Sequence, residues 1–527
     1  MSPMITVAIT AVGLYLLKWL FQASFKQKAT LGKLPPGPPR KPFVGNLNDL
    51  PSHEVKPWEH WLKHKDLYGP ISSLTVSGQN IVIVNDMHLA IELLERRSLT
   101  YSSRPHMNFA SLAGWDKMLG CVEYSPRFKA IRRAIHRQVG SNVSVAGFRS
   151  VQEVEVRRLL YRLLEDPANL TKHIRKEAGG IVLKIAYGYN VDPHQPDPLV
   201  DLADKAMDDF SFAFLSGTWA VDFLPFLKHV PAWFPGAQFA RVAKAFRARA
   251  HAFSTVPYDF TRSRMAKGDY TPSFLSNLLE EGVPKPGSEE EIVVKWASSV
   301  LYGGGADTTV STMRGWFLAM AMFPEVQRQA QAEIDRVVGP GRLPTFEDRE
   351  NLPYINAMIK EIIRWHPILP MGAAHTSIRD DVWGEYVIPK GTMVMPNTWA
   401  FTHDPVTYPD PEAFKPERFL HSEGHVPEQD PYYLTFGHGR RVCPGRTLAD
   451  ANLFLSIAQV VASFNITKPI RDGKEVDLSL ELTNGIIVHP KPFEVDIKPR
   501  SAAYAKIIQE GDLQWEDSNA DELSGLQ

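Results

Sequence analysis

A long helical pattern runs through the middle of the chain, from Ser288 to Pro324. Ser288 and Glu291 form the sequence signature of a capping box, and Phe323 is the last residue before the proline that ends the pattern. The apolar content of the segment predicts a buried helix of about eight turns. Because a buried helix of this length must be enclosed by other elements, it constrains the fold more than any other feature.

Three consecutive glycines, 303–305, lie at the centre of this predicted helix, and each costs about 0.8–1.0 kcal/mol relative to alanine. Close helix packing, which small residues permit, is one explanation. The other is that a bound group lies almost on the backbone and that the helix is locally distorted beside it. Asp307, Thr308 and Thr309 are poor interior residues for a buried helix and favour the second explanation. The segment is therefore a candidate site.

The other patterns are mostly helical up to about residue 365, with no internal repeat. A hairpin is predicted over 71–86, and further strand patterns cover 380–397 and 480–498. The predicted fold class is therefore mainly α with a smaller β-rich part, in one large domain.

The composition excludes several functions. Lysine and arginine number 58 against 59 acidic residues, so the net charge of −1 gives no global preference for nucleic acid. The two cysteines, Cys121 and Cys443, are too few for a disulfide framework or for a four-cysteine metal site. They fit a reducing compartment.

Positions 4–21 form an apolar run whose one charge is Lys18. As a helix this run spans about 27 Å, enough to cross a bilayer. A cleaved signal peptide is the alternative, but no basic residue precedes the run and no small-residue cleavage pattern follows it. Basic residues gather downstream, so the positive-inside rule predicts an uncleaved anchor over 1–24 and a cytosolic body.

The segments that follow differ in composition. Residues 25–42 are basic and proline-rich and predict a semi-rigid hinge that holds the body against the membrane. Residues 43–500 form the predicted globular domain. The tail over 501–527 is acidic and is predicted to be disordered.

Glu361 and Arg364 lie three residues apart on a predicted helix over 353–367 and therefore share a face. As a surface pair they would mean little. Their neighbours are so apolar that the pair is expected to be buried, and a buried arginine needs more than one partner. Arg418 belongs to a segment that can join them in such a cluster.

Cys443 follows a loop made flexible by Gly437 and Gly439 and precedes an apolar helical pattern over 446–464. A thiol at a helix N-terminus beside arginines favours the thiolate. A lone thiolate is either a nucleophile, for which His438 is the near base, or the single thiolate ligand of a metal. A haem iron needs one thiolate, cations for its propionates and glycines that let the macrocycle approach, and this segment supplies all three.

At every fixed position, Phe436-x-x-Gly439-x-Arg441-x-Cys443-x-Gly445 resembles the haem-binding signature of the cytochrome P-450 family. The segment 304–309 resembles the oxygen-binding helix of that family, and Glu361, Arg364 and Arg418 resemble its structural triad. The resemblance covers nearly the whole chain and is closest to fungal microsomal members, including those of specialised metabolism. It implies the cytochrome P-450 fold, with a single large haem-binding domain over 43–500 behind the anchor.

The resemblance assigns roles to individual residues. Cys443 would be the axial ligand of the haem b iron, pushing electron density toward it. The remaining cofactor-binding positions are Arg441, His375 and Arg132, which would bind the propionates, together with Phe436 and Gly445 of the signature. Thr308 and Asp307 would hold a water and relay protons on the oxygen side.

One position departs from the family pattern. Four residues before Arg132 the family usually has a tryptophan, and here the residue is Phe128. The aromatic face remains but the indole N–H donor is lost, which puts haem affinity or redox potential at that edge in doubt.

The implied reaction is the insertion of one oxygen atom from O2 into a lipophilic small molecule, such as a terpenoid of fungal specialised metabolism. The chain has no dinucleotide-binding fingerprint of its own, so electrons would come from an NADPH-dependent flavoprotein reductase. A basic segment over 127–137 would face that partner, or would be only a solvated face. The implied location is the membrane of the endoplasmic reticulum, with a single span. A haem-thiolate isomerase or dehydratase, or a non-catalytic haem- or lipid-binding protein, is the alternative.

Two further expectations concern the substrate. By family position the pocket should be lined by apolar residues, which are Phe109, Leu112, Trp115, Phe212, Phe214, Leu369, Met371 and Ile486. Prolines around Trp233 and Phe234 forbid a regular helix, so these aromatic residues are expected on a loop that enters the bilayer beside the substrate entrance, unless they fold into the core.

Overall fold

The computed structural model describes residues 32–42, 44–52, 54–215, 218–511, 513 and 517–525. The predicted anchor over 1–24 lies outside these residues. Among the helices that the structure does describe, none combines the length and the apolar character that a bilayer span requires.

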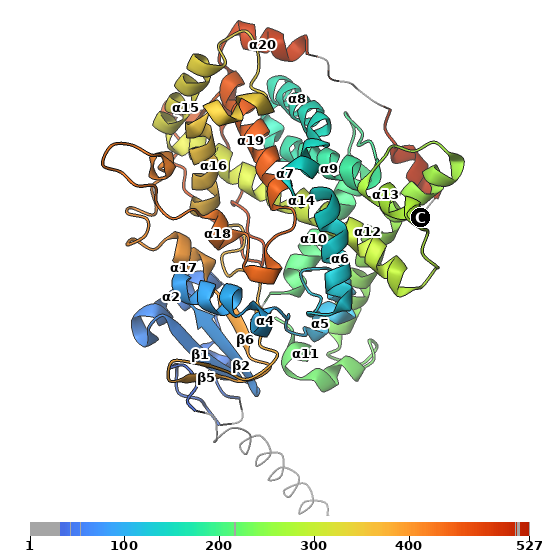
Figure 1. The fold of residues 1–527 in the computed structure, drawn as a ribbon, viewed down its shortest axis with the longest axis vertical. Coiled ribbons are helices and arrows are strands. Elements are labelled where there is room, and N and C mark those ends of the chain that lie inside the picture. The colour runs from blue at the N-terminus through green and yellow to red at the C-terminus, as the bar shows by residue number, and fades with distance from the viewer. Residues whose placement is uncertain are drawn as a thin grey trace, which may run out of the picture.

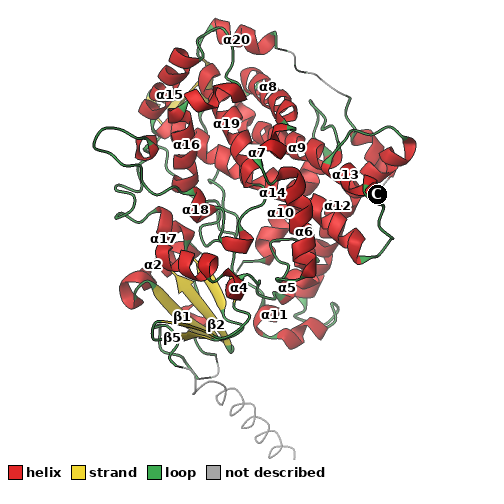
Figure 2. Cartoon of the chain, in the orientation of Figure 1, coloured by secondary structure: helices red, strands yellow, loops and turns green. Residues whose placement is uncertain are grey.

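Helices make up most of the molecule and surround one central helix, α14 (Figures 1 and 2). Helices α6, α9, α10, α12, α13, α16 and α19 all contact α14, so the predicted buried helix is the core of the fold. The helices are α2 (Pro57–Tyr68), α3 (Met87–Ala90), α4 (Ser98–Tyr101), α5 (Asn108–Leu112), α6 (Pro126–Val139), α7 (Asn142–Ala146), α8 (Arg149–Glu165), α9 (Leu170–Tyr187), α10 (Pro198–Ala213), α11 (Ala220–Phe223), α12 (Gln238–Lys267), α13 (Phe274–Glu280), α14 (Glu289–Met322), α15 (Pro324–Val337), α16 (Pro353–Trp365), α17 (Thr398–Thr402), α18 (Tyr432–Thr435), α19 (Arg446–Ser463) and α20 (Ala502–Gln509).

The N-terminus of α14 is capped by Ser288, whose hydroxyl accepts a hydrogen bond from the Glu291 N–H at 3.1 Å. The Glu291 carboxylate accepts from the Gly287 N–H and not from that of Ser288. The predicted capping box is therefore only half formed, because the glutamate reaches one residue further back. The helix ends at Met322, before the proline that opens α15.

The largest sheet has the strand order β1-β2-β6-β3, with β1 (Ile71–Val76), β2 (Gln79–Val84), β3 (His375–Thr376) and β6 (Met393–Pro396). The predicted hairpin is confirmed: β1 and β2 are antiparallel, and Ser77 and Gly78 form its turn with φ of 47° and 86°. Strand β6 runs parallel to β2. The two-stranded sheets pair β4 (Asp381–Trp383) with β5 (Tyr386–Ile388), β7 (Phe464–Thr467) with β10 (Asp496–Pro499), and β8 (Ile470–Arg471) with β9 (Lys474–Glu475).

The strand predicted over 480–498 is mostly wrong. Only β10 at its end forms a strand, and before it one isolated bridge joins Leu482 to Pro490. The mainly helical fold with a small β-rich part is confirmed.

The proline-rich segment is attached to the sheet over the part that the structure describes. The Pro36 carbonyl accepts from the Ser73 N–H at 2.7 Å, and the Pro35 carbonyl accepts from the Ser73 hydroxyl at 2.5 Å. A Cβ at Gly37 would lie 1.9 Å from the Ser73 carbonyl oxygen, so only glycine fits there. Residues 35–37 are therefore part of the globular body and not a free spacer.

The tail also differs from its prediction of disorder. Residues of α20 pack on the body through buried Tyr504 and Ile508. Further along, Leu523 is buried, and Glu522 pairs with Arg264 of α12 at 3.0 Å. The prediction rested on the acidic composition of the tail and overlooked its few apolar residues, of which Tyr504, Ile508 and Leu523 are buried.

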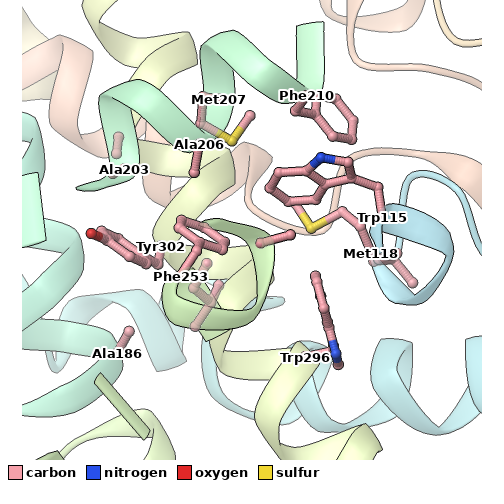
Figure 3. Close-up of a cluster of buried hydrophobic side chains, with 14 of the residues drawn as sticks. Trp115, Met118, Ala186, Ala203, Ala206, Met207, Phe210, Phe253, Trp296 and Tyr302 are labelled. Carbon is pink, nitrogen blue, oxygen red and sulfur yellow. The ribbon is translucent and has the colours of Figure 1, made fainter. Parts of the chain in front are cut away.

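An aromatic cluster fills the space between α14 and helices α10 and α12 (Figure 3). The rings of Phe253 and Tyr302 stack at 4.6 Å, and Trp115 meets Phe210 edge-on at 5.2 Å. This cluster fixes the glycine-bearing turn of α14 from one side.

Candidate active site

A cavity of about 320 Å³ lies between the middle of α14 and the loop that leads into α19. Gly304 and Thr308 line one wall, and Cys443 and Gly445 belong to the loop. Most of the remaining lining is apolar and comes from α9, α14, the segment after α16, and α19. These residues include Ile181, Val182, Val300, Leu301, Ile368, Leu369, Leu448 and Leu453.

The three glycines of α14 have different surroundings. A Cβ at Gly305 would lie 2.3 Å from Val182 Cγ1, and one at Gly303 would lie 3.0 Å from both Met207 Sδ and Phe253 Cζ. At Gly304 no atom lies within 4 Å of a built Cβ, because this residue faces the cavity. Gly303 and Gly305 therefore permit close packing, and Gly304 leaves open space on the cavity wall.

The expected distortion of α14 at the glycines is absent. The segment is assigned as α-helix from Glu289 to Met322 without interruption. Thr308 adds a hydrogen bond from its hydroxyl to the Gly304 carbonyl at 2.6 Å, across the turn that borders the cavity. Thr308 thus bonds to the backbone of its own helix, and the helix keeps its regular geometry.

The loop before Cys443 needs its two glycines. Gly437 and Gly439 have φ of 80° and 53°, and a Cβ at Gly439 would lie 2.7 Å from the Leu94 carbonyl oxygen. The turn closes with a hydrogen bond of 2.7 Å from the Cys443 N–H to the Phe436 carbonyl. This geometry sets Cys443 on the cavity wall, where it is accessible from the cavity although protein surrounds it.

The direction of the Cys443 pKa differs from the prediction. Burial raises the pKa of the thiol, and the Gly445 N–H and the charges of Arg132 and Arg446 oppose this effect without outweighing it. The prediction weighed the arginines and the helix N-terminus but not the desolvation of the sulfur.

Two buried arginines line the cavity and bond to backbone carbonyls. Arg441 donates to the carbonyls of Ser102, Leu119 and Val122, and burial lowers its pKa to about 8. Arg104 donates to further carbonyls and also has its pKa lowered by burial, to about 10. Within the described part of the chain neither guanidinium forms an ion pair with a carboxylate, so their charges suit an anionic ligand.

Arg104 was missed by the sequence reasoning. Its only local signal is the Arg-Pro pair at 104–105, which is unremarkable by itself. Beside it, His375 lines the cavity, and its Nδ1 donates to the Tyr101 carbonyl at 2.7 Å, which fixes the ring. Burial and the charge of Arg104 hold the pKa of His375 well below its usual range.

Arg132 and Phe128 support the loop from behind the cavity wall. Arg132 is absent from the cavity lining and donates to the Val442 carbonyl, next to Cys443. The ring of Phe128 lies 3.9 Å from the guanidinium of Arg441, a cation–π contact. The aromatic face that the sequence retains at this position therefore serves Arg441.

Asp307 lies outside the cavity lining, although Thr308 beside it lines the wall. Its Oδ1 is 3.0 Å from Nε2 of His489. No local pattern around Asp307 indicates this partner, because His489 belongs to a distant segment near the C-terminus. Of the two residues to which one joint role was assigned, the structure therefore places only Thr308 on the cavity wall.

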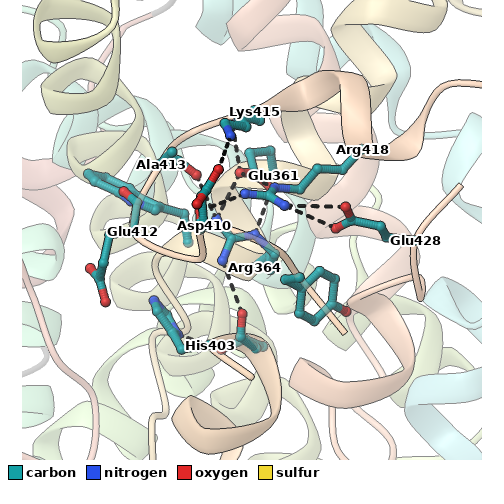
Figure 4. A network of polar contacts seen from close by, with 12 residues as sticks. Glu361, Arg364, His403, Asp410, Glu412, Ala413, Lys415, Arg418 and Glu428 are labelled. Carbon is teal, nitrogen blue, oxygen red and sulfur yellow. Dashed lines mark hydrogen bonds and ion pairs between the residues drawn. The ribbon is translucent and has the colours of Figure 1, made fainter. Parts of the chain in front are cut away.

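Glu361 and Arg364 are fully buried and form a two-bond pair, at 2.7 and 2.8 Å (Figure 4). Arg418 lies 3.4 Å from Glu361 and also pairs with Glu428 at 3.2 Å. Arg364 further donates to the Thr402 and Ala413 carbonyls. The cluster connects α16 to the segment over 402–428 and lies outside the cavity lining.

Of the pocket residues expected by position, Leu369 lines this cavity and the other seven do not. Trp115 is buried in the packed core (Figure 3). Phe109 is also buried, and its ring stacks on Trp219 at 3.5 Å. Phe212 is exposed. Phe109 and Trp115 pack in the core and not in the pocket, because large aromatic rings gain most from complete burial.

Known proteins resemble this chain along its whole length. Residues 35–497 match the model of the cytochrome P-450 family. The cytochrome P-450 monooxygenase ppsD of Aspergillus oryzae is 48% identical, with 100% of both chains covered. The monooxygenase claR of Ampulloclitocybe clavipes is 44% identical, over 95% of this chain and 93% of the relative, and the O-methylsterigmatocystin oxidoreductase of Aspergillus flavus is 41% identical, over 99% and 98%.

The chain therefore belongs to the cytochrome P-450 family, and its relatives are fungal monooxygenases. The family implies a haem, and the cavity fits one. It offers a thiol on the wall, open space at Gly304 and Gly445, and the buried guanidinium groups of Arg441 and Arg104. Within the described residues these two groups bond to backbone carbonyls and have no carboxylate partner.

Proposed function

We propose that this monooxygenase inserts one oxygen atom from O2 into a lipophilic small molecule of fungal specialised metabolism, such as a terpenoid. Electrons come from an NADPH-dependent reductase. The observation that carries the proposal is the placement of Cys443 and Thr308 on the walls of one largely apolar cavity. When bound, the haem supplies the activation of oxygen.

The residues of the chain take distinct parts in this scheme. Cys443 would provide the thiolate ligand, and Arg441 and Arg104 would hold the haem carboxylates. His375 would donate to a carboxylate only as an imidazolium, because its Nδ1 proton is already donated to the Tyr101 carbonyl. Arg132 holds the loop at Val442, one residue before the ligand. Thr308 offers a hydroxyl on the cavity wall from which a proton can be moved.

The walls favour an apolar substrate. Val182, Val300, Leu301 and Leu369 supply aliphatic surface, and they also pack in the hydrophobic cluster that contains the aromatic core. Such a surface binds a substrate by burying its apolar area and offers few partners for charged groups. A lipophilic substrate follows from this lining.

Membrane attachment is part of the proposal. Between α11 and α12, Trp233 is 80% exposed in an irregular segment, and Phe226 is 65% exposed in a short 3-10 helix over Pro225–His229. Large aromatic side chains in this setting suit the interfacial zone of a bilayer. Together with the anchor predicted over 1–24, they support a single-pass protein of the endoplasmic reticulum with a cytosolic body.

The reductase would approach the face of α6. Arg127 and Arg137 on this helix already pair with Glu289 and Glu281 of the same chain. Lys129 and Arg133 are the basic residues of α6 left for an acidic partner, and Lys129 lies over the ring of Tyr124.

The test is co-expression with an NADPH-dependent fungal reductase, followed by comparison of the metabolites with those of a Cys443→Ala control under isotopically labelled oxygen. The proposal predicts new products that carry one labelled oxygen atom, formed only with NADPH and the intact cysteine. Products without labelled oxygen would support an isomerase or dehydratase. No NADPH consumption above the control would contradict the monooxygenase assignment.

A further inference from the structure

Asp307 is held by a residue that no part of the family signature includes. Its Oδ1 lies 3.0 Å from Nε2 of His489, and the side chains are only 14% and 18% exposed. His489 is the one ion-pair partner that the described residues give Asp307. The backbone of His489 is fixed in turn, because its N–H donates to the Thr483 hydroxyl at 3.0 Å and its carbonyl accepts from the Thr483 N–H at 2.9 Å.

Other charged groups surround this pair but do not replace it. Asp204 of α10 pairs with Arg175 of α9 at 3.0 Å, and the charge of Asp307 is one cause of the raised pKa of Asp204. Arg314, two turns after Asp307 on α14, makes no ion pair within the described residues and lies over the ring of Phe493. His366 bonds to the Ser311 hydroxyl at 2.9 Å.

Within the described residues, the contact with His489 is therefore the one ion-pair contact that holds the Asp307 side chain. The contact with His489 lies outside the cavity lining, and Thr308, the next residue, lines the cavity.

We propose that His489 is a positioning residue for proton supply: it holds the Asp307 carboxylate at a fixed place beside Thr308, from which Thr308 is resupplied with protons. This rests on the proposed monooxygenase function. Each proton that leaves Thr308 Oγ1 is replaced by one that reaches it from the Asp307 carboxyl group or from a water on that group. The carboxylate then takes a proton from solvent, and no electron moves.

Two substitutions of His489 test whether its role is to hold the Asp307 carboxylate by an N–H donor. His489→Gln keeps an N–H donor for Asp307, whereas His489→Leu keeps the bulk and removes the donor. Lys491→Gln is the matched control, because Lys491 lies two residues away on the same segment and pairs with Glu481 at the surface. Asp307→Asn supplies the background in which the contact no longer involves a carboxylate.

The first readout needs no turnover. Thermal unfolding of the ferric haem-loaded protein is compared across wild type, His489→Leu, Asp307→Asn and the double variant. The proposal predicts non-additive midpoint shifts, because His489→Leu removes the contact and Asp307→Asn weakens the same contact by removing the charge. Additive shifts would contradict a direct hold of Asp307 by His489.

The second readout uses NADPH, O2 and the reductase, with no organic substrate, and measures how much consumed NADPH appears as hydrogen peroxide and how much as water. We expect His489→Leu to raise the ratio of peroxide to water roughly tenfold, as loss of one hydrogen bond to a charged group would do. His489→Gln and Lys491→Gln should stay near wild type, and His489→Leu should add nothing in the Asp307→Asn background.

The outcomes are distinguishable from failure of the function itself. If wild type consumes no NADPH above the Cys443→Ala control, the proposed function fails, and the unfolding cycle alone decides whether His489 holds Asp307. If wild type consumes NADPH and His489→Leu leaves the ratio unchanged, the inference is overturned. If His489→Gln is as impaired as His489→Leu, the ring itself is required and the holding role is wrong.

Discussion

The hydroxyl of Thr308 donates a hydrogen bond of 2.6 Å to the carbonyl oxygen of Gly304, one turn earlier on α14. Both residues line the cavity, and at Gly304 the space beside the backbone is open. A hydroxyl has a single proton, and here the helix holds it. The hydroxyl must therefore turn away from the helix before it can donate a proton into the cavity.

Thr308→Ala should keep haem and ligand binding but divert NADPH electrons into hydrogen peroxide, because the cavity loses its hydroxyl proton donor. General acid catalysis of this kind typically contributes about 10²–10⁴-fold, so product per NADPH should fall clearly. Thr308→Ser, which retains the hydroxyl, is the control and should stay close to wild type. An unchanged yield of product per NADPH in Thr308→Ala would show that this hydroxyl has no such role.

Glu361→Ala should prevent recovery of soluble haem-loaded protein. Arg364 is fully buried and has Glu361 as its carboxylate partner, whereas Arg418 retains Glu428. Leaving a buried charge unpaired typically costs about 3–5 kcal/mol. Lys415→Met, which removes a surface pair with Asp410, is the matched control and should fold normally. A stable Glu361→Ala holoprotein with normal spectra would mean that carbonyl groups alone satisfy Arg364.

Glu177 gives the protein a pH-dependent stability. It is fully buried, and burial raises its pKa from 4.5 to about 7, although Asn452 and Ser456 donate hydrogen bonds to it. Since the folded pKa lies above the unfolded value, the stabilisation is complete below about pH 4.5 and is lost as the pH rises through about 7.

Glu177→Gln should therefore stabilise the protein at about pH 8, by up to about 3 kcal/mol, and have little effect near about pH 5. Denaturant unfolding of the ferric protein at the two pH values measures the difference. Glu165→Gln on the exposed end of α8 controls for the loss of a charge and should show no such pH dependence. If Glu177→Gln changes the free energy of unfolding equally at both pH values, Glu177 does not titrate between them in the folded protein.

Membrane contact should survive removal of the predicted anchor. A protein lacking residues 1–33 should still bind microsomal lipid vesicles, and Trp233→Ser with Phe234→Ser should largely remove that binding, because both side chains are exposed. Flotation with vesicles measures the bound fraction, and circular dichroism checks that the double variant is folded. Complete solubility of the shortened protein before the two changes would argue against contact through this loop.

The sequence predicted the features that depend on neighbouring residues. The hairpin turn at Ser77 and Gly78, the long helix α14 and the glycine-dependent loop before Cys443 each rest on local backbone chemistry. Short-range patterns also sufficed to show that Glu361 and Arg364 share a face of α16.

The sequence could not predict contacts between distant segments. Nothing near Asp307 indicates that His489 will meet it, and nothing near Arg104 indicates that it will lie in the same cavity as Arg441. The family resemblance placed Trp115 in the pocket, but Trp115 is packed in the core. Burial also raises the thiol pKa of Cys443, and neighbouring residues do not indicate this effect because burial is a property of the whole fold.

The central claim is that Cys443 is the thiolate ligand of a haem held in this cavity. The direct measurement is the absorption difference spectrum of the dithionite-reduced protein with and without carbon monoxide, for wild type and Cys443→Ala. The account predicts that wild type shows the long-wavelength Soret band of thiolate-bound ferrous haem and that Cys443→Ala lacks it. The same band in Cys443→Ala, at the same intensity, would contradict the assignment.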